Sequence, residues 1–145
     1  MKIIHEGNFS TFSIYLTING RLPSFDLITK EIGMSPILTG RVKEKIRDLN
    51  PNNDFLYDVW GVGFEGKPFP CLSEAMEVLI GNVSGAIEKF KRLKIRGGFE
   101  LSVDAEVVVK DYVPLLDLTA EVMAWMVDLG ANFSIEVFDP EHNLN

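Results

Sequence analysis

The sequence predicts one α+β domain: a mainly antiparallel sheet with helices packed on one face, its elements in the order β-α-β-α-β-α-β. Residues 9–19, 97–109 and 131–139 alternate apolar and polar side chains, as strands do when one face is buried and the other is wet. Three intervening segments space their apolar residues three and four apart, which is typical of helices that cover a sheet. At 145 residues the chain fits a single domain, 1–145, with residues 140–145 expected to fray.

The first half of the chain begins with the strand at Phe9–Asn19, which is rich in β-branched and aromatic residues. A short helix then runs from an N-cap at Ser24 to a stop at Gly33. Residues 35–54 mix charges with proline and glycine, and we interpret them as a loop, with a single helical turn as the alternative. The aromatic-rich segment Asp54–Gly66 is partly apolar on both faces, which predicts an interior strand.

The second half opens with the longest predicted helix, from Ser73 to about Leu93, whose apolar residues follow one stripe. Gly81 and Gly85 lie inside it, and we interpret them as places of close packing or of a mild kink. The remaining elements are a strand at Gly97–Val109, a helix from an Asp117 N-cap to Leu129, and a strand at Ala131–Asp139.

Charge narrows the classes of partner. The formal net charge is −7, with 21 acidic residues against 14 basic ones. This balance argues against nucleic acid, whose phosphates are bound by cationic side chains, and allows a basic protein partner. No run approaches the length of a membrane span, and the single cysteine, Cys71, fits a reducing compartment, so we expect a cytoplasmic protein that does not bind membranes.

Motifs that carry chemistry are weak throughout the sequence. His5 and His142 stand near the termini, so a pairing with a nucleophile such as Cys71 would need a terminus to fold inward. The segment "GVGFEG" lacks the spacing of a dinucleotide-binding turn, and "DPEHN" is a poor metal site in a tail expected to fray. We therefore predict no catalytic residue, no metal site and no cofactor, and we expect a protein that is not an enzyme.

The polar face of the predicted sheet is the remaining candidate for a working surface. If the strands are neighbours, that face collects Tyr15, Thr17, Glu100, Ser102, Asp104, Glu106, Ser134 and Glu136. It could simply keep the protein soluble and discourage association of strand edges. It could also receive a partner rich in arginine and lysine through electrostatic steering. On the second interpretation the predicted partner-binding residues are Tyr15, Glu100, Asp104, Glu106 and Glu136.

Three sequence elements together resemble a family. An "ITKEIGMSP" element holds Ile28 to Pro36, a tryptophan follows a strand at Trp60, and "LGANFSIEVF" closes the chain at Leu129 to Phe138. Together they resemble the bacterial domain-of-unknown-function family 4279, although Asn132 and Phe138 depart from its pattern. The resemblance implies a small bacterial domain with no assigned catalytic residues. Small acidic proteins of this general kind often serve as immunity proteins that neutralise a toxin, which is an analogy.

Three hypotheses follow. The first is a non-enzymatic binding protein, an immunity protein that neutralises a cationic toxin domain through the acidic sheet face. The second is a small-ligand-binding or hydrolytic domain, with a pocket between sheet and helices near Trp60 or with Glu100, Asp104 and Glu106 as paired carboxylates. The third is a homodimer that associates through Phe138 or the edge of the last strand.

Overall fold

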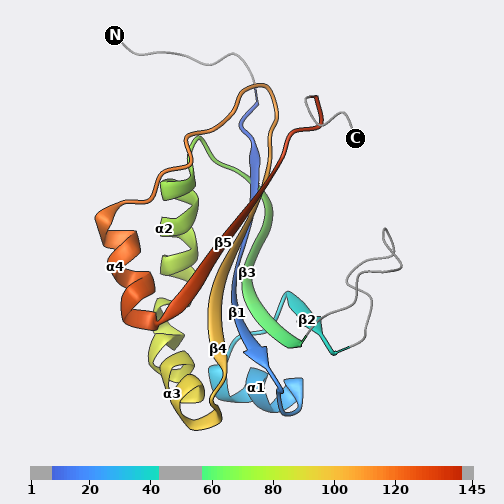
Figure 1. The fold of residues 1–145 in the computed structure, drawn as a ribbon, viewed down its shortest axis with the longest axis vertical. Coiled ribbons are helices and arrows are strands. Elements are labelled where there is room, and N and C mark those ends of the chain that lie inside the picture. The colour runs from blue at the N-terminus through green and yellow to red at the C-terminus, as the bar shows by residue number, and fades with distance from the viewer. Residues whose placement is uncertain (1–7, 43–56, 142–145) are drawn as a thin grey trace.

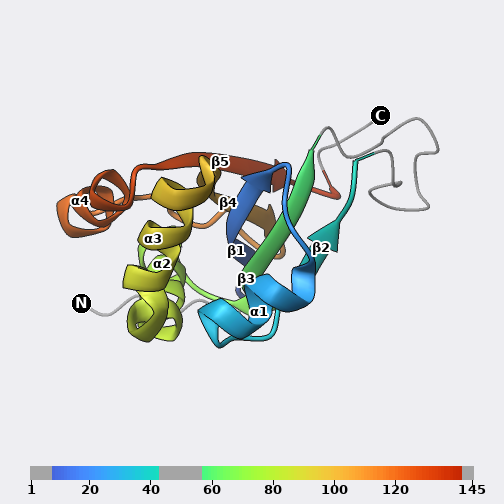
Figure 2. The same cartoon turned by 90° about the horizontal axis from the view of Figure 1, so that it is seen from below.

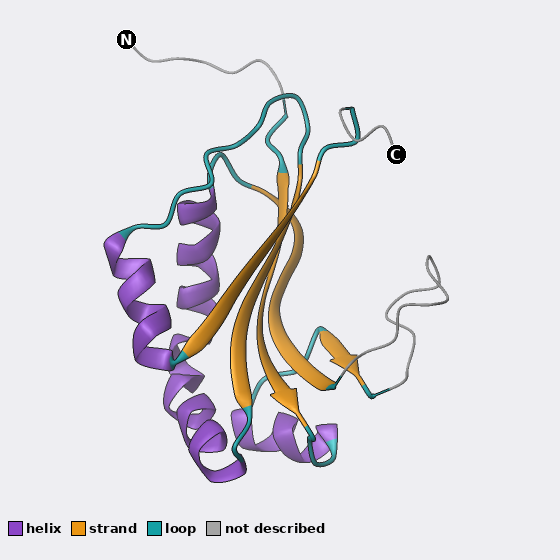
Figure 3. Ribbon diagram, in the orientation of Figure 1, coloured by secondary structure: helices purple, strands orange, loops and turns teal. Residues whose placement is uncertain are grey.

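A five-stranded sheet forms the centre of the molecule in the computed structural model, which describes residues 8–42 and 57–141 (Figure 1). Its strands lie in the order β2-β3-β1-β4-β5, and the helices gather on one face of the sheet (Figures 2 and 3). The elements are β1 (Thr11–Gly20), α1 (Phe25–Ile32), β2 (Leu38–Gly40), β3 (Asp58–Pro68), α2 (Leu72–Val83), a 3-10 turn (Ser84–Ala86), α3 (Ile87–Gly97), β4 (Glu100–Val108), α4 (Ala120–Leu129) and β5 (Ala131–Phe138).

Strand β1 is the centre of the sheet and pairs antiparallel with both β3 and β4. Its even-numbered residues from Phe12 to Ile18 point toward the helices and are fully buried. Side chains at every second position of β3 and β4 join them, because paired residues in neighbouring strands point to the same face. The core between sheet and helices is built on Phe12, Ile14, Leu16, Ile18, Trp60, Val62, Leu72, Met76, Leu79, Phe90, Leu101 and Val103.

The predicted α+β class is confirmed, but the predicted order of elements is not. The short strand β2 lies within residues 35–54, where the sequence predicts a loop; residues 43–56 lie outside the described part of the chain. The sheet is also mixed, because β5 pairs parallel to β4. Parallel neighbours need a crossover connection, and α4 supplies it by carrying the chain back to the end of the sheet where β4 begins. Alternating hydrophobicity cannot distinguish these two directions of pairing.

The prediction of a single long helix at residues 73–93 is wrong. The structure divides it into α2 and α3, with a 3-10 turn at Ser84–Ala86 between them. A methyl group added to Gly81 or Gly85 would meet no atom within 4 Å, so neither glycine serves close packing. Glycine weakens a helix by about 1 kcal/mol relative to alanine, and the division occurs where two glycines stand four residues apart.

The predicted end of α1 at Gly33 is confirmed, but neither predicted N-cap side chain, Ser24 or Asp117, caps its helix. Gly33 closes α1 in the left-handed conformation, as expected, but the Ser24 side chain makes no capping bond. Helix α4 begins at Ala120, and its N-cap is Thr119, whose hydroxyl accepts the Val122 N–H at 3.2 Å. The Asp117 carboxylate, expected to cap α4, instead accepts the Ser73 N–H at the start of α2. It thereby ties the segment before α4 to a helix 44 residues earlier.

Asp58 holds the turn after β1 against the start of β3. Its carboxylate accepts the backbone N–H groups of Val42 and Leu22, each at 3.0 Å, and the Arg41 guanidinium at 3.1 Å. These backbone bonds, together with Arg41, hold the pKa of Asp58 below its usual value. Arg41 also lies over the Phe25 ring, 3.8 Å from its centroid, which joins α1 to this junction.

Gly63 is the position at which the sheet is least able to accept a side chain. Its φ is +145°, and an added Cβ would lie 1.9 Å from the Ile14 carbonyl oxygen of β1. We expect Gly63→Ala to lower the free energy of unfolding by more than about 3 kcal/mol, because the backbones of β1 and β3 must separate. Gly81→Ala, in the open interior of α2, is the matched control and should raise it by up to about 1 kcal/mol. Urea unfolding followed by tryptophan fluorescence measures both; equal stability of the two variants would contradict the close approach.

Candidate functional site

The face of the sheet opposite the helices, called here the open face, carries a polar surface across four strands. Register fixes its membership, because Tyr15 pairs with Asp104, Thr17 with Ser102, and Ser134 with Asp104 in turn. The open face consists of Thr11, Ser13, Tyr15, Thr17 and Asn19 of β1, Val59, Gly61, Gly63 and Glu65 of β3, Glu100, Ser102, Asp104, Glu106 and Val108 of β4, and Asn132, Ser134, Glu136 and Phe138 of β5.

Two glycines of β3 shape the middle of this face. Gly61 and Gly63 stand opposite Thr17 and Tyr15, so the β1 side chains have room to lie over the β3 backbone. The Thr17 methyl occupies the space that a Cβ at Gly61 would take, at 2.8 Å from it. As a result Thr17 is 0% exposed and Tyr15 only 5%. The face predicted to be wet is therefore polar, but its centre is buried.

Buried hydroxyl groups need hydrogen-bond partners, and the Asp104 carboxylate is the acceptor at the centre of those on this face. Its Oδ2 lies 3.0 Å from the Ser102 hydroxyl and 3.3 Å from the Thr17 hydroxyl, while its Oδ1 accepts the Ser134 hydroxyl at 2.6 Å. Ser102 also accepts the Asn19 amide N–H at 2.9 Å and lies 2.7 Å from Thr17 Oγ1. We call these five residues, Asn19, Thr17, Ser102, Asp104 and Ser134, the Asp104 network.

The Asp104 network links β1, β4 and β5 through side chains alone. A serine hydroxyl has one proton, so Ser102, which donates to Asp104, receives its other two bonds as an acceptor. The chain of donors therefore points toward a carboxylate, which accepts hydrogen bonds and donates none when ionised. Such an arrangement suits a fixed negative charge with a set orientation.

A second polar pair stands beside the network. The Tyr15 hydroxyl donates to Glu65 Oε1 at 3.0 Å. Glu65 reaches it because β3 carries an extra residue there: the pairing shifts between Phe12 and Ile14, and the N–H of Gly66 donates to the Ser13 hydroxyl. Burial, the bond to Glu65 and that carboxylate's charge raise the pKa of Tyr15 to about 12.

All five predicted partner-binding residues lie on the open face. Tyr15 and Asp104 are paired across β1 and β4, and Glu106 stands beside Glu136 across β4 and β5. Glu100 is opposite Asn19 at the far end of β4 and is exposed. No experiment or comparison tests their role in binding, which stays a prediction.

Asn19 and Glu65, whose side chains hydrogen-bond at this site, are among the members of this face that sequence reasoning did not identify. Asn19 continues the alternation of Ser13, Tyr15 and Thr17, and this spacing could have identified it. Glu65 could not be found in that way, because the extra residue in β3 changes the alternation at that point. None of the open-face strand positions carries a lysine or an arginine, so every formal charge on this face is negative.

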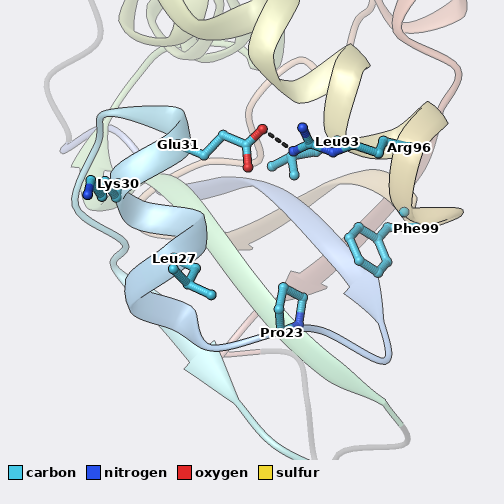
Figure 4. Close-up of a pocket in the computed structure, with 8 residues that line it drawn as sticks. Pro23, Leu27, Lys30, Glu31, Leu93, Arg96 and Phe99 are labelled. Atoms are coloured by element: carbon cyan, nitrogen blue, oxygen red, sulfur yellow. Dashed lines mark hydrogen bonds and ion pairs between the residues drawn. The ribbon is translucent and has the colours of Figure 1, made fainter.

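Trp60, the expected landmark of a pocket, is a core residue. It is fully buried beside the Phe90 ring, and its indole N–H donates to the Thr29 hydroxyl at 3.1 Å. An open cleft of about 560 Å³ lies elsewhere, between α1 and the end of α3 (Figure 4). The ion pair between Arg96 and Glu31 stands at its rim, and its lining is largely apolar: Pro23, Leu27, Leu93 and Phe99.

The other candidate catalytic and metal-binding residues, as far as the structure describes them, do not come together in a site. Cys71 is half-buried at the N-cap of α2, with Sγ 3.3 Å from the Ser73 hydroxyl. His5 and His142 lie outside the described residues, and within the described ranges no three histidine, cysteine or acidic residues are placed to hold a metal ion. None of the helices among residues 8–42 and 57–141 has the length and apolar character to cross a membrane.

Comparison with known proteins gives one result. The family model "Domain of unknown function (DUF4279)" matches residues 10–139, which includes every strand and helix of the structure. No curated protein and no solved structure matches the chain.

The Tyr15 hydroxyl gives a pH-dependent test of the site. Because its folded pKa of about 12 exceeds the unfolded value near 10, the unfolded chain loses this proton first as pH rises. The stability contributed by the neutral phenol should therefore be complete below about pH 10 and be lost between about pH 10 and 12. Tyr15→Phe lacks this ionisation, so the parent protein should lose stability relative to the variant over that interval.

Urea unfolding at about pH 9 and about pH 11 measures the difference, and the tyrosinate absorbance of the two proteins locates the missing titration. Glu65→Gln removes the hydrogen-bonded carboxylate charge and should move the Tyr15 titration downward. A parent-minus-variant titration centred near pH 10 would show that Tyr15 is solvated and that the pair with Glu65 is not formed.

Proposed function

Since the chain belongs to the DUF4279 family, a domain without an established function, we propose from its surface that it is a non-enzymatic binding protein for a cationic protein partner. The partner we propose is a basic toxin domain, which this protein would neutralise as an immunity protein in a bacterial cytoplasm. The observation that carries the proposal is the open face, on which every formal charge is negative.

The geometry supports recognition rather than chemistry. Ser102 of β4 and Ser134 of β5 donate to Asp104, and Thr17 of β1 donates to Ser102, so the charge of Asp104 is held in place before a partner arrives. Preorganised groups bind without the entropic cost of ordering side chains at the interface. Glu100, Glu106 and Glu136 stand around it on the same face and enlarge the negative field. A field of one sign accelerates the approach of an oppositely charged partner and discourages acidic ones.

Charge also distinguishes this face from the surface of the helices. Lys89, Lys91, Lys94 and Arg96 all lie on α3, which packs on the other side of the sheet. The helices also carry Glu74, Glu77 and Glu121, so the charges on that side are mixed, whereas the strand positions of the open face carry negative charges alone. The small-ligand alternative would use the cleft between α1 and α3, away from these carboxylates.

The test compares two triple variants that carry the same net charge. Glu100→Gln with Glu106→Gln and Glu136→Gln removes three of the five negative charges of the open face and changes no member of the Asp104 network. Glu74→Gln with Glu77→Gln and Glu121→Gln is the control, because these exposed residues lie on α2 and α4. The probe is a basic protein domain that co-purifies with the tagged parent protein, and its affinity for each variant is measured at low and at moderate salt.

We expect the open-face variant to lose about 10-fold or more in affinity, mainly through slower association, while the control changes by less than about 2-fold. Added salt should weaken binding of the parent and of the control more than that of the open-face variant. Equal losses in both variants would mean that net charge alone matters. Undiminished binding by the open-face variant would place the partner on another surface.

A further inference from the structure

The outer edge of β5 is the longest unpaired strand edge among the described residues. β5 spans eight residues. At the opposite edge β2 spans three and pairs with β3 at positions 59–61, so that the seven positions 62–68 of β3 have no strand neighbour there among the described residues. In Figure 1 β5 runs across the front of the sheet, and no other helix or strand lies in front of it. Ile135, Val137 and Phe138 are 36%, 44% and 53% exposed although all three are apolar.

Strand β5 also lacks the usual devices that prevent edges from pairing. Proteins protect such edges with lysine, proline, bulges or short strands. The sequence "ANFSIEVF" contains no lysine or proline, its pairing with β4 is regular, and its only charged residue is Glu136. An edge with these properties is suited to pair with another strand.

Hydrogen-bond alternation identifies the backbone groups that are available. The Phe138 carbonyl accepts the Val109 N–H at 2.8 Å, so Phe138 directs its backbone toward β4. In a strand the N–H and C=O of alternate residues point to opposite sides. Phe133, Ile135 and Val137 therefore direct their N–H and C=O groups outward, away from the sheet.

These three residues form a set that is complementary to itself. When two β5 strands run antiparallel about Ile135, Ile135 faces Ile135 of the second copy and Phe133 faces Val137 of the second copy. All the outward N–H and C=O groups of the three residues are then paired, as antiparallel hydrogen-bonded pairs require. Apolar side chains face apolar ones on the helix side of the sheet.

Charge supports the same register. Centring on Ile135 places Glu136 opposite Ser134 of the second copy. A shift that centres the pairing on Glu136 would place two glutamates opposite one another, which is unfavourable. A two-fold axis generates this contact from one surface patch and closes the assembly at two copies.

We propose that the protein is a homodimer in which two β5 edges pair antiparallel about Ile135 and join two five-stranded sheets into one. The axis stands perpendicular to the sheet, so both open faces lie on the same side of the dimer and the helices lie on the other. The inference does not depend on the proposed function, since it concerns the edge of β5 and not the charge of the open face.

The first experiment measures oligomeric state by analytical ultracentrifugation at micromolar concentration. The parent should sediment as a dimer and Ile135→Pro as a folded monomer, because proline removes an N–H that points away from β4. Val137→Lys should also give a monomer, which covers the case that the proline variant fails to fold. Ile95→Lys, at an exposed apolar site on α3, should remain dimeric. A monomeric parent, or a dimer that survives both β5 variants, would overturn the proposal.

The second experiment tests the register by oxidative cross-linking in a Cys71→Ser background. Ile135→Cys should form a disulfide-linked dimer, because the two copies of residue 135 face each other across the axis. Val137→Cys should not, since its two copies would lie about 14 Å apart along the strands. Efficient cross-linking at position 137, or none at position 135, would contradict the register.

Discussion

The pairing of β1 with two neighbours along its length is the constraint on which the rest of the structure depends. With β3 on one side and β4 on the other, the backbone of β1 is enclosed. Its helix-side residues form the core, and its open-face residues are buried too, although they are tyrosine, threonine and asparagine. Buried polar groups need partners, so the open face must be built as a hydrogen-bonded network. That requirement explains why serine, threonine and aspartate recur opposite one another on β1, β4 and β5.

The glycines of β3 belong to the same constraint. A side chain at position 61 or 63 would compete with Thr17 and Tyr15 for the surface of the sheet. Without one, Thr17 reaches Ser102 and Tyr15 reaches Glu65. The network keeps its central hydroxyl groups away from water and leaves the carboxylates around it for solvent or a partner. The carboxylates around the network and the hydrogen-bonded hydroxyl groups within it therefore both follow from the enclosure of β1 between β3 and β4.

Strand β5 is the edge strand of the sheet and the last strand that joins the Asp104 network. It touches the network through Ser134 and pairs with β4, but its other edge has no neighbour in the described chain. The α4 crossover brings it in parallel to β4, which extends the acidic face by Glu136 and leaves three residues with outward backbone groups. The same strand thus completes one surface, which we propose binds a partner, and supplies another, which we propose pairs with a second copy.

The sequence by itself determined the fold class, four of the five strands and many of the residues on each face, because alternation with a period of two depends on local side-chain pattern. It also determined the ends of α1 and α4, where Gly33 and Gly130 adopt the left-handed conformation. Tertiary structure alone decided the features that depend on which segments meet. These are the parallel pairing of β5, the bond from the start of α2 to Asp117, and the burial of Thr17 over Gly61. In each case the physical cause is a contact between residues far apart in the chain, and no local pattern encodes such a contact.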